Sequence, residues 1–240
     1  MKTYLSGRSA TTLGAALTAV ALALTLTACT SEAPAPEGRS GSALDHIHGL
    51  GLRGDTLYVA THQGLHTPDV AGRPTLVGDR RDDFMGFTVT ARGDFLASGH
   101  PTPGGDRPAD LGLIASTDSG RTWQERSLAG KVDFHALDTA ADSTVYGYDS
   151  ANGLLRVSAD GVTWEDRAAL RALDIAVSPA APGTVLATTE DGVVRSTDGG
   201  RTFAPSASGR VLAYVSWAAP DALFGIDPRS AVVPAGPSWP

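Results

Sequence analysis

The chain has 240 residues, a formal net charge of −7, 28 glycines, 15 prolines and one cysteine. An acidic chain repels nucleic-acid backbones, so no nucleic-acid partner is expected, and a single cysteine excludes an intramolecular disulfide. The length is sufficient for one domain with a sizeable core. The glycine and proline content favours many short strands joined by turns.

The N-terminal residues have the order of a secretory signal. Lys2 and Arg8 precede an apolar run that starts at Leu13 and ends in small residues before Cys29. This run is too short to span a bilayer comfortably, which predicts that residues 1–28 form a cleaved leader. Removing its two cationic residues changes the formal charge from −7 to −9.

The sequence Leu-Thr-Ala-Cys at residues 26–29 resembles the lipobox of bacterial lipoproteins. This resemblance implies that the sulfur of Cys29 receives a diacylglyceryl group and that Cys29 becomes the mature N-terminus. Two acyl chains hold a protein stably on a membrane surface. We therefore expect a lipid-anchored protein on the extracytoplasmic face of the cell membrane. The alternative is an ordinary secretory signal with a chance cysteine.

A polar segment rich in proline, glycine and serine follows at residues 30–43. Such a composition cannot bury apolar surface, so the lipidated cysteine and this segment, residues 29–43, are expected to form a flexible linker. The folded domain is predicted to cover residues 44–226.

A short motif recurs three times at nearly even spacing. Its copies are Ser-Thr-Asp-Ser-Gly-Arg-Thr-Trp at 116–123, Ser-Ala-Asp-Gly-Val-Thr-Trp at 158–164 and Ser-Thr-Asp-Gly-Gly-Arg-Thr-Phe at 196–203. The aspartates Asp118, Asp160 and Asp198 are 42 and 38 positions apart. The motif resembles the Asp-box, or BNR, repeat of sialidase-like β-propellers, which are often labelled glycosyl hydrolases. That resemblance implies a structural role for these aspartates within a β-turn, with the aromatic residue packed between blades.

Short alternating segments accompany each repeat and predict an all-β fold, a β-propeller of four-stranded antiparallel blades. First strands are expected to begin near His48, Met85, His135, Asp174 and Tyr214. Second strands are expected at residues 56–60, 94–98, 144–148, 184–188 and 222–226. Five blade starts are therefore visible, and the first blade carries a degenerate box at residues 65–69.

Residues 227–240 contain four prolines and no box, so we expect an irregular tail without a third strand in the last blade. The family resemblance implies further repeats, which favours a chain truncated at its C-terminus. The alternative is a small five-bladed ring that closes with help from the N-terminal strand.

The repeat alignment places five of the six histidines at one mouth of the central channel. They lie at the starts of first strands or the ends of second strands: His46, His48, His62, His100 and His135. Met85, Asp174 and Tyr214 share the aligned first-strand position of His48 and His135. Imidazole with thioether suits copper, especially Cu(I), and imidazole alone suits Cu(II) or Zn(II). We therefore expect copper first, zinc second, and no organic cofactor.

Two other interpretations of these residues remain open. The histidines and Met85 can instead fill the channel through ordinary hydrogen bonds and packing. Several aspartates near the same mouth can orient imidazoles as hydrogen-bond partners: Asp45, Asp82, Asp83, Asp133 and Asp149.

The sequence therefore predicts a membrane-anchored propeller that binds a metal ion or small ligand at the histidine-lined mouth. A sialidase-like exo-glycosidase is one alternative, with Tyr214, Asp174 and Asp149 as catalytic candidates. No arginine occupies the aligned channel positions, so the arginine clamp of sialidases is missing from this pattern. A non-catalytic scaffold for a membrane-protein partner is the other alternative.

Overall fold

The computed structural model describes residues 44, 46–206, 209–229 and 231–234. The predicted leader, the lipidation site Cys29, the linker and Asp45 lie outside the described residues. The described part of the chain consists of strands and connecting turns, and it contains no helix capable of crossing a membrane.

The described strands form five antiparallel sheets, which are the blades of a β-propeller. Blade 1 contains β1 (Ile47–Arg53), β2 (Thr56–Thr61), β3 (Gly64–Pro68) and β4 (Pro74–Leu76). Blade 2 contains β5 (Asp83–Val89), β6 (Phe95–His100), β7 (Leu113–Ser116) and β8 (Gln124–Ser127). Blade 3 contains β9 (Phe134–Thr139), β10 (Val145–Asp149), β11 (Leu154–Ser158) and β12 (Glu165–Ala169).

The remaining two blades complete the described fold. Blade 4 contains β13 (Asp174–Val177), β14 (Val185–Thr189), β15 (Gly192–Ser196) and β16 (Ala204–Pro205). Blade 5 contains β17 (Tyr214–Ala219), β18 (Ala222–Ile226) and β19 (Val232–Pro234). The predicted all-β propeller, with five blade starts and an incomplete last blade, is confirmed.

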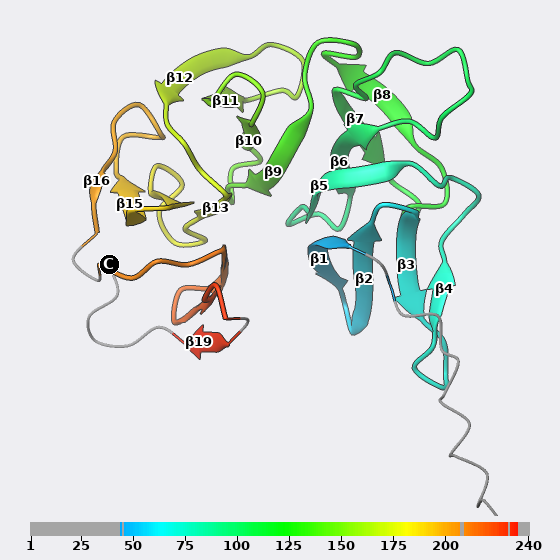
Figure 1. The fold of residues 1–240 in the computed structure, drawn as a ribbon, viewed down its shortest axis with the longest axis horizontal. Coiled ribbons are helices and arrows are strands. Elements are labelled where there is room, and N and C mark those ends of the chain that lie inside the picture. Colours follow the sequence, from blue (N-terminus) through cyan, green and yellow to red (C-terminus); the bar gives the residue numbers. More distant parts are fainter. Residues whose placement is uncertain (1–43, 45, 207–208, 230, 235–240) are drawn as a thin grey trace, which may run out of the picture. The chain divides into compact units, whose positions relative to one another are not determined.

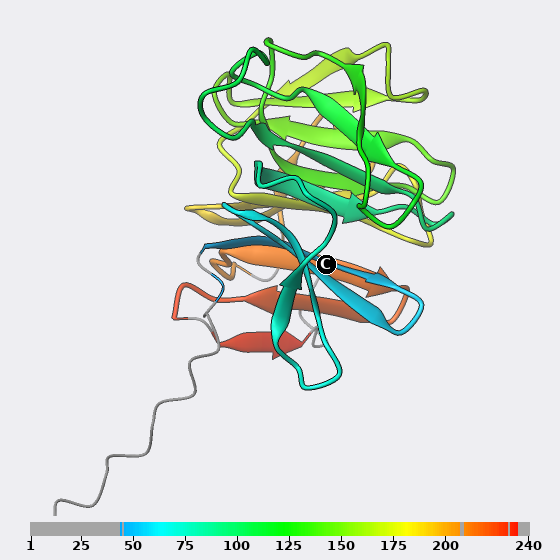
Figure 2. The same ribbon diagram turned by 90° about the vertical axis from the view of Figure 1, so that its right-hand side faces the viewer.

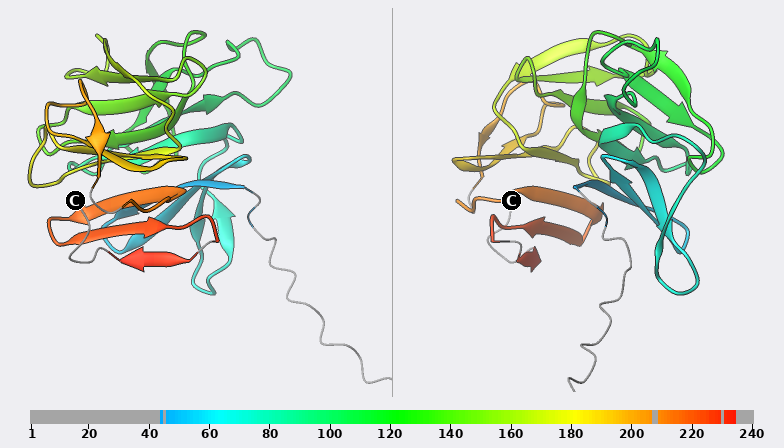
Figure 3. Two further views of the ribbon diagram at one scale, coloured as in Figure 1. Left: turned by 60° about the vertical axis from the view of Figure 1, so that its left-hand side comes forward. Right: turned by 45° about the vertical axis from the view of Figure 1, so that its right-hand side comes forward.

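Consecutive blades pack through their first strands, so that β1 lies against β5, β5 against β9, β9 against β13, and β13 against β17 (Figure 1). The other strands of each blade follow outward in chain order. Figure 2 shows the same blades from the side, and Figure 3 shows them in two oblique views.

The core consists of apolar layers between neighbouring blades. Leu65 of blade 1 and Phe95 of blade 2 are both fully buried in one such layer. The aromatic residues of the repeats join these layers: the Trp123 ring lies 5.1 Å from that of Phe84, and the Trp164 ring lies 4.8 Å from that of Phe134. Each repeat therefore ties its turn to the core.

The repeat aspartates close their own turns. Asp118 accepts hydrogen bonds from the Thr122 backbone N–H at 2.9 Å, the Thr122 hydroxyl at 2.7 Å and the Ser116 hydroxyl at 2.8 Å. Because these donors favour the ionised form, they lower the pKa of Asp118 to about 2. Gly120 has a φ of 81°, a conformation that favours glycine. In the second repeat, Asp160 accepts the backbone N–H groups of Val162 and Thr163. In the third repeat, Asp198 accepts those of Arg201 and Thr202.

Two further aspartates link one blade to the next. Asp138 accepts the Val177 backbone N–H at 2.7 Å, and Asp174 accepts the Val215 backbone N–H at 2.9 Å. Both carboxyls lie deep among protein atoms, although part of each residue surface is still accessible. Burial away from water raises the pKa of Asp138 to about 6 and that of Asp174 to about 7.

The expected absence of a third strand in the last blade is wrong. Val232–Pro234 forms β19, which pairs with β18 through Phe224↔Pro234, Gly225↔Val233 and Ile226↔Val232. Proline is tolerated there because the strand lies at the edge of the described sheet, where an N–H on the outer side needs no partner.

The two end blades leave apolar side chains exposed. Leu50 and Phe87 occupy the same strand position, opposite Val59 and Ala97 of their second strands. Phe87 is 6% exposed because blade 1 covers it, whereas Leu50 is 61% exposed. No contact of comparable extent joins β1 to β17 in the described part of the chain, so closure of the ring by the N-terminal strand is not observed.

Blade 5 shows the same contrast on its opposite face. Phe224 and Leu186 occupy equivalent positions in β18 and β14, and Phe224 is 42% exposed while Leu186 is fully buried. Tyr214 and Val232 are also exposed. The outer faces of the two end blades therefore have the apolar side chains typical of an interface between blades, but no sheet of the described residues covers them.

The contrast between Leu50 and Phe87 predicts unequal costs of truncation. Phe87→Ala is expected to lower the free energy of unfolding by about 3–5 kcal/mol, because it removes a buried ring and leaves a cavity. Leu50→Ala is expected to cost less than about 1 kcal/mol. Urea unfolding at several protein concentrations measures both values. Equal costs would show that the face of Leu50 is covered in solution.

Asp174 predicts a specific dependence of stability on pH. Its folded pKa of about 7 exceeds the ordinary value, so the folded state binds the proton more tightly. Its contribution is fully present below about pH 4 and is lost as the pH rises through 7. In Asp174→Asn, the amide oxygen still accepts the Val215 N–H, and the stability loss between these pH values should shrink by about 1–3 kcal/mol. Urea unfolding across this range tests the difference, with exposed Asp55→Asn as the control. An unchanged pH dependence in Asp174→Asn would contradict it.

Candidate metal centre

The first strands of blades 1 to 3 each contain a β-bulge near the same end. In β1 the register passes from Ile47↔Thr61 to Gly49↔Ala60, so His48 is the extra residue. The corresponding extra residues in β5 and β9 are Met85 and His135. A bulge changes the direction of the side chain that it adds. The three extra residues therefore occupy equivalent positions in their blades.

Asp174 and Tyr214 do not share this position, so the predicted equivalence is wrong for them. β13 contains no bulge, and Asp174 pairs with Thr188. In blade 3 the residue equivalent to Thr188 is Tyr148, which pairs with Ala136. Asp174 is therefore equivalent to Ala136 and not to His135. Tyr214 pairs with Ile226 in the same way. Without the added residue, Asp174 lies one position later in the strand and binds the next blade instead of joining the histidines.

One group of side chains joins blades 1 and 2. The His62 Nδ1 atom lies 2.7 Å from Asp83 Oδ2, and His48 Nε2 lies 3.4 Å from His62 Nδ1. His48 Nε2 is also 3.7 Å from Asp83 Oδ1. The ring of His46 lies 4.6 Å from the ring of His62. We call His48, His62 and Asp83 the first triad; one potential ligand atom from each lies within 4.8 Å of the others.

A second group joins blades 2 and 3. His135 Nε2 lies 2.7 Å and His100 Nε2 lies 3.2 Å from Asp133 Oδ2. The other nitrogen of His100, Nδ1, is 3.1 Å from the Ala109 carbonyl oxygen, a distance at which Nδ1–H donates to that oxygen. His100, Asp133 and His135 form the second triad, whose potential ligand atoms also lie within 4.8 Å of one another.

Each triad contains one buried carboxylate oxygen without a hydrogen-bond partner in the described part of the chain. These atoms are Oδ1 of Asp83 and Oδ1 of Asp133. Leaving such an atom unpaired costs about 1–3 kcal/mol, and more for a charged group. Two imidazoles next to an unpaired carboxylate oxygen are donors that a transition-metal ion accepts, so both triads fit a bound cation.

The two triads have different proton affinities. Burial away from water, followed by the charge of His62, lowers the pKa of His48. The hydrogen bond with Asp133 raises the pKa of His135. A proton therefore competes less with a cation at His48 than at His135.

The other predicted site residues have different partners. The buried carboxylate of Asp82 accepts Arg107 Nη1 at 2.7 Å and the Thr102 N–H at 2.9 Å, which anchors the loop after His100. Asp149 is fully buried and accepts Asn152 Nδ2 at 2.8 Å.

Met85 is half-buried at the bulge of β5, two residues after Asp83. Its strand position is that of His48 and His135, as the repeat alignment predicts.

The structure brings four of the five predicted histidines into the two triads and places His46 beside the first. It also adds Asp83 and Asp133 as potential ligands, whereas the sequence predicts them only as orienting partners. A signal for the aspartates was present in the sequence. His46-Ile-His48, Asp83-Phe-Met85 and Asp133-Phe-His135 repeat one spacing at the start of each first strand. His66 stands apart on β3, with Nδ1 3.5 Å from the Thr61 hydroxyl.

The glycosidase candidates are not assembled into a site by these contacts. Asp174 binds the Val215 N–H, and Asp149 is held by Asn152 and by Arg156, whose Nε lies at 3.1 Å. Tyr214 is 45% exposed on the end blade.

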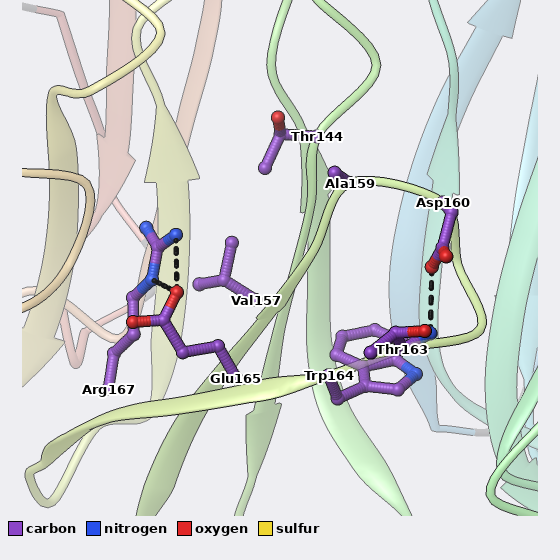
Figure 4. Close-up of a pocket in the computed structure, with 8 residues that line it drawn as sticks. All are labelled: Thr144, Val157, Ala159, Asp160, Thr163, Trp164, Glu165 and Arg167. Atoms are coloured by element: carbon purple, nitrogen blue, oxygen red, sulfur yellow. Dashed lines mark hydrogen bonds and ion pairs between the residues drawn. The ribbon is translucent and has the colours of Figure 1, made fainter.

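A separate hollow of about 300 Å³ lies beside the second repeat turn (Figure 4). Its lining residues are Thr144, Val157, Ala159, Asp160, Thr163, Trp164, Glu165 and Arg167. The polar groups there already pair with one another: Arg167 Nη2 lies 3.1 Å from Glu165 Oε2, and the Thr163 N–H donates to Asp160 at 2.7 Å. The histidine triads are therefore the stronger candidate site.

Comparison with known proteins supports the fold alone. No protein-family model and no curated protein sequence matches the chain. Virginiamycin B lyase from Staphylococcus aureus is similar in structure, with 8% identity, a TM-score of 0.53, and coverage of 82% of this chain and 73% of that chain. A GH74 enzyme from Niastella koreensis shows 16% identity, a TM-score of 0.56, and coverage of 81% of this chain and 30% of that chain. YCF48 bound to D1 peptide shows 14% identity, a TM-score of 0.55, and coverage of 76% and 61%.

The hydrogen bond between Asp133 and His135 predicts a shifted titration in metal-free protein. The pKa of His135 should lie above the ordinary histidine value of about 6.5 and fall in Asp133→Asn, because the neutral amide no longer stabilises the imidazolium. NMR titration of the histidine ring protons measures the shift. His66, on another strand, is the internal control, and a His135 pKa unaffected by Asp133→Asn would contradict the assignment.

Proposed function

We propose that this propeller binds a transition-metal ion through the histidine and aspartate side chains at one end of blades 1 to 3. The proposal rests on one observation above all: a buried carboxylate oxygen of Asp83 and one of Asp133 lack hydrogen-bond partners in the described residues, while imidazole nitrogens contact the other oxygen of each carboxylate. A bound cation would satisfy these oxygens and offset the cost of burying them.

The donor atoms favour a divalent ion. Imidazole nitrogen and carboxylate oxygen suit Cu(II) and Zn(II), whereas Cu(I) prefers thiolate and thioether ligands. Copper remains the first choice because it binds such donors more tightly than zinc in the general order of divalent affinities. Zinc is the second choice. Met85, on the strand of Asp83, would add a thioether only if its side chain turned toward the first triad.

The physiological setting follows from the N-terminal sequence. The leader would direct export before its cleavage, and the lipidated Cys29 would then hold the propeller at the extracytoplasmic face of the cell membrane, with residues 30–43 as a spacer. The function we propose is therefore metal handling at a membrane surface, such as retention of the ion or its delivery to a membrane-protein partner.

A scaffold for a protein partner is the second candidate. It is favoured by the exposed apolar side chains of the end blades, among them Leu50 and Phe224. Partner binding by such a scaffold would be unchanged when the triad histidines are replaced.

Metal retention tests the proposal directly. We expect the full chain carrying Cys29→Ser, which removes the competing thiol, to retain Cu(II) or Zn(II) through dialysis. The double variant His48→Gln/His135→Gln should weaken binding by about 100-fold or more, since each triad loses one ligand. Elemental analysis and titration calorimetry measure retention and affinity.

The matched control is His66→Gln, which removes a histidine that lies in blade 1, like His48, but outside both triads. It should leave affinity unchanged. The proposal fails if the parent protein retains no metal, or if the control loses as much affinity as the double variant.

A further inference from the structure

We infer that the histidine cluster is a centre for two metal ions, with one ion at each triad, rather than a single site shared by all five imidazoles. This inference rests on the proposed metal-binding function.

The donor distances separate the cluster into two groups. Potential ligand atoms of His48, His62 and Asp83 lie within 4.8 Å of one another, and so do those of His100, Asp133 and His135. No group of this kind in the described residues combines members of both triads. A single ion requires all its ligands within about 2.0–2.3 Å, so each triad has its own point of convergence.

Each triad also has its own unsatisfied carboxylate oxygen. Oδ1 of Asp83 and Oδ1 of Asp133 are both buried without a hydrogen-bond partner among the described residues. One ion at the first triad would leave the oxygen of Asp133 unpaired, and the reverse is equally true. Two ions satisfy both oxygens.

Blade 2 holds the two sites next to each other. Asp83 of the first triad pairs directly across the sheet with His100 of the second, at the ends of β5 and β6. Two divalent ions held so close repel each other, so the second ion should bind more weakly than the first.

The ligand sets differ between the sites. His46 lies with its ring 4.6 Å from that of His62 and has a φ of 49°, an uncommon backbone conformation outside glycine. His46 thereby places a third imidazole beside the first triad. The second triad has two imidazoles and one carboxylate, with His100 oriented by the Ala109 carbonyl oxygen. The first site should therefore fill first with Cu(II), which favours imidazole-rich sites.

Two single substitutions separate the sites. His62 and His100 have half-exposed side chains, so their replacement should leave the fold intact. In the Cys29→Ser background, the parent protein should bind two Zn(II) or Cu(II) ions per chain, with the second at least several-fold weaker. His62→Gln and His100→Gln should each bind one ion, and the combined variant none. Titration calorimetry with elemental analysis counts the ions, and thermal unfolding without metal checks the fold.

Electron paramagnetic resonance gives an independent readout. With two equivalents of Cu(II), the parent protein should show dipolar broadening from neighbouring copper ions, and each single variant should show one unbroadened signal.

The possible outcomes separate the two proposals. Binding of no ion by the parent protein would overturn the proposed function itself. Binding of one ion, abolished by either single substitution, would support the proposed function and overturn the two-site inference. Two ions without dipolar broadening would also overturn it, because the ions would then not be neighbours.

Discussion

Face-to-face packing of consecutive blades is the constraint on which the rest of this structure depends. Each blade is a small sheet that cannot bury its apolar faces alone, so Phe87, Leu137 and Leu186 become buried only when the next or preceding blade covers them. The same packing sets the first strands side by side and aligns their ends. Residues that are far apart in the sequence, such as His48 and His135, thereby come close together at one end of the propeller.

Buried carboxylates serve two purposes within this frame. Asp138 and Asp174 each accept a backbone N–H from the next blade, and their raised pKa values reflect the cost of burying charge to fix the blade register. Asp83 and Asp133 lie at the bulged ends of first strands, where one oxygen of each is left without a hydrogen-bond partner in the described chain. An uncompensated buried oxygen is unfavourable for folding alone, which is the physical reason to expect a cation there.

The bulges distinguish the first three blades from the fourth. One extra residue in β1, β5 and β9 changes which side chain is directed toward the end of the propeller, whereas β13 pairs without interruption. Local register therefore decides whether a polar residue near a strand start joins the histidine cluster or links two blades. Asp174 shows the second outcome, and His135 shows the first.

The sequence alone determined the all-β propeller, the places of its first and second strands, and the turns closed by Asp118, Asp160 and Asp198, because these features depend on short-range periodicity and on contacts within a few residues. It also indicated that five histidines gather at one end, since equivalent positions of a repeat fall at equivalent places. Only the tertiary structure showed that four of these histidines divide into two triads with Asp83 and Asp133, and that His46 lies beside the first triad. It also showed that Asp174 and Tyr214 lie outside the triads and that Val232–Pro234 adds a strand. Those details depend on a one-residue shift of register and on which residues pair across strands. The hydrogen bonds between strands decide both, and the repeat pattern in the sequence does not encode them.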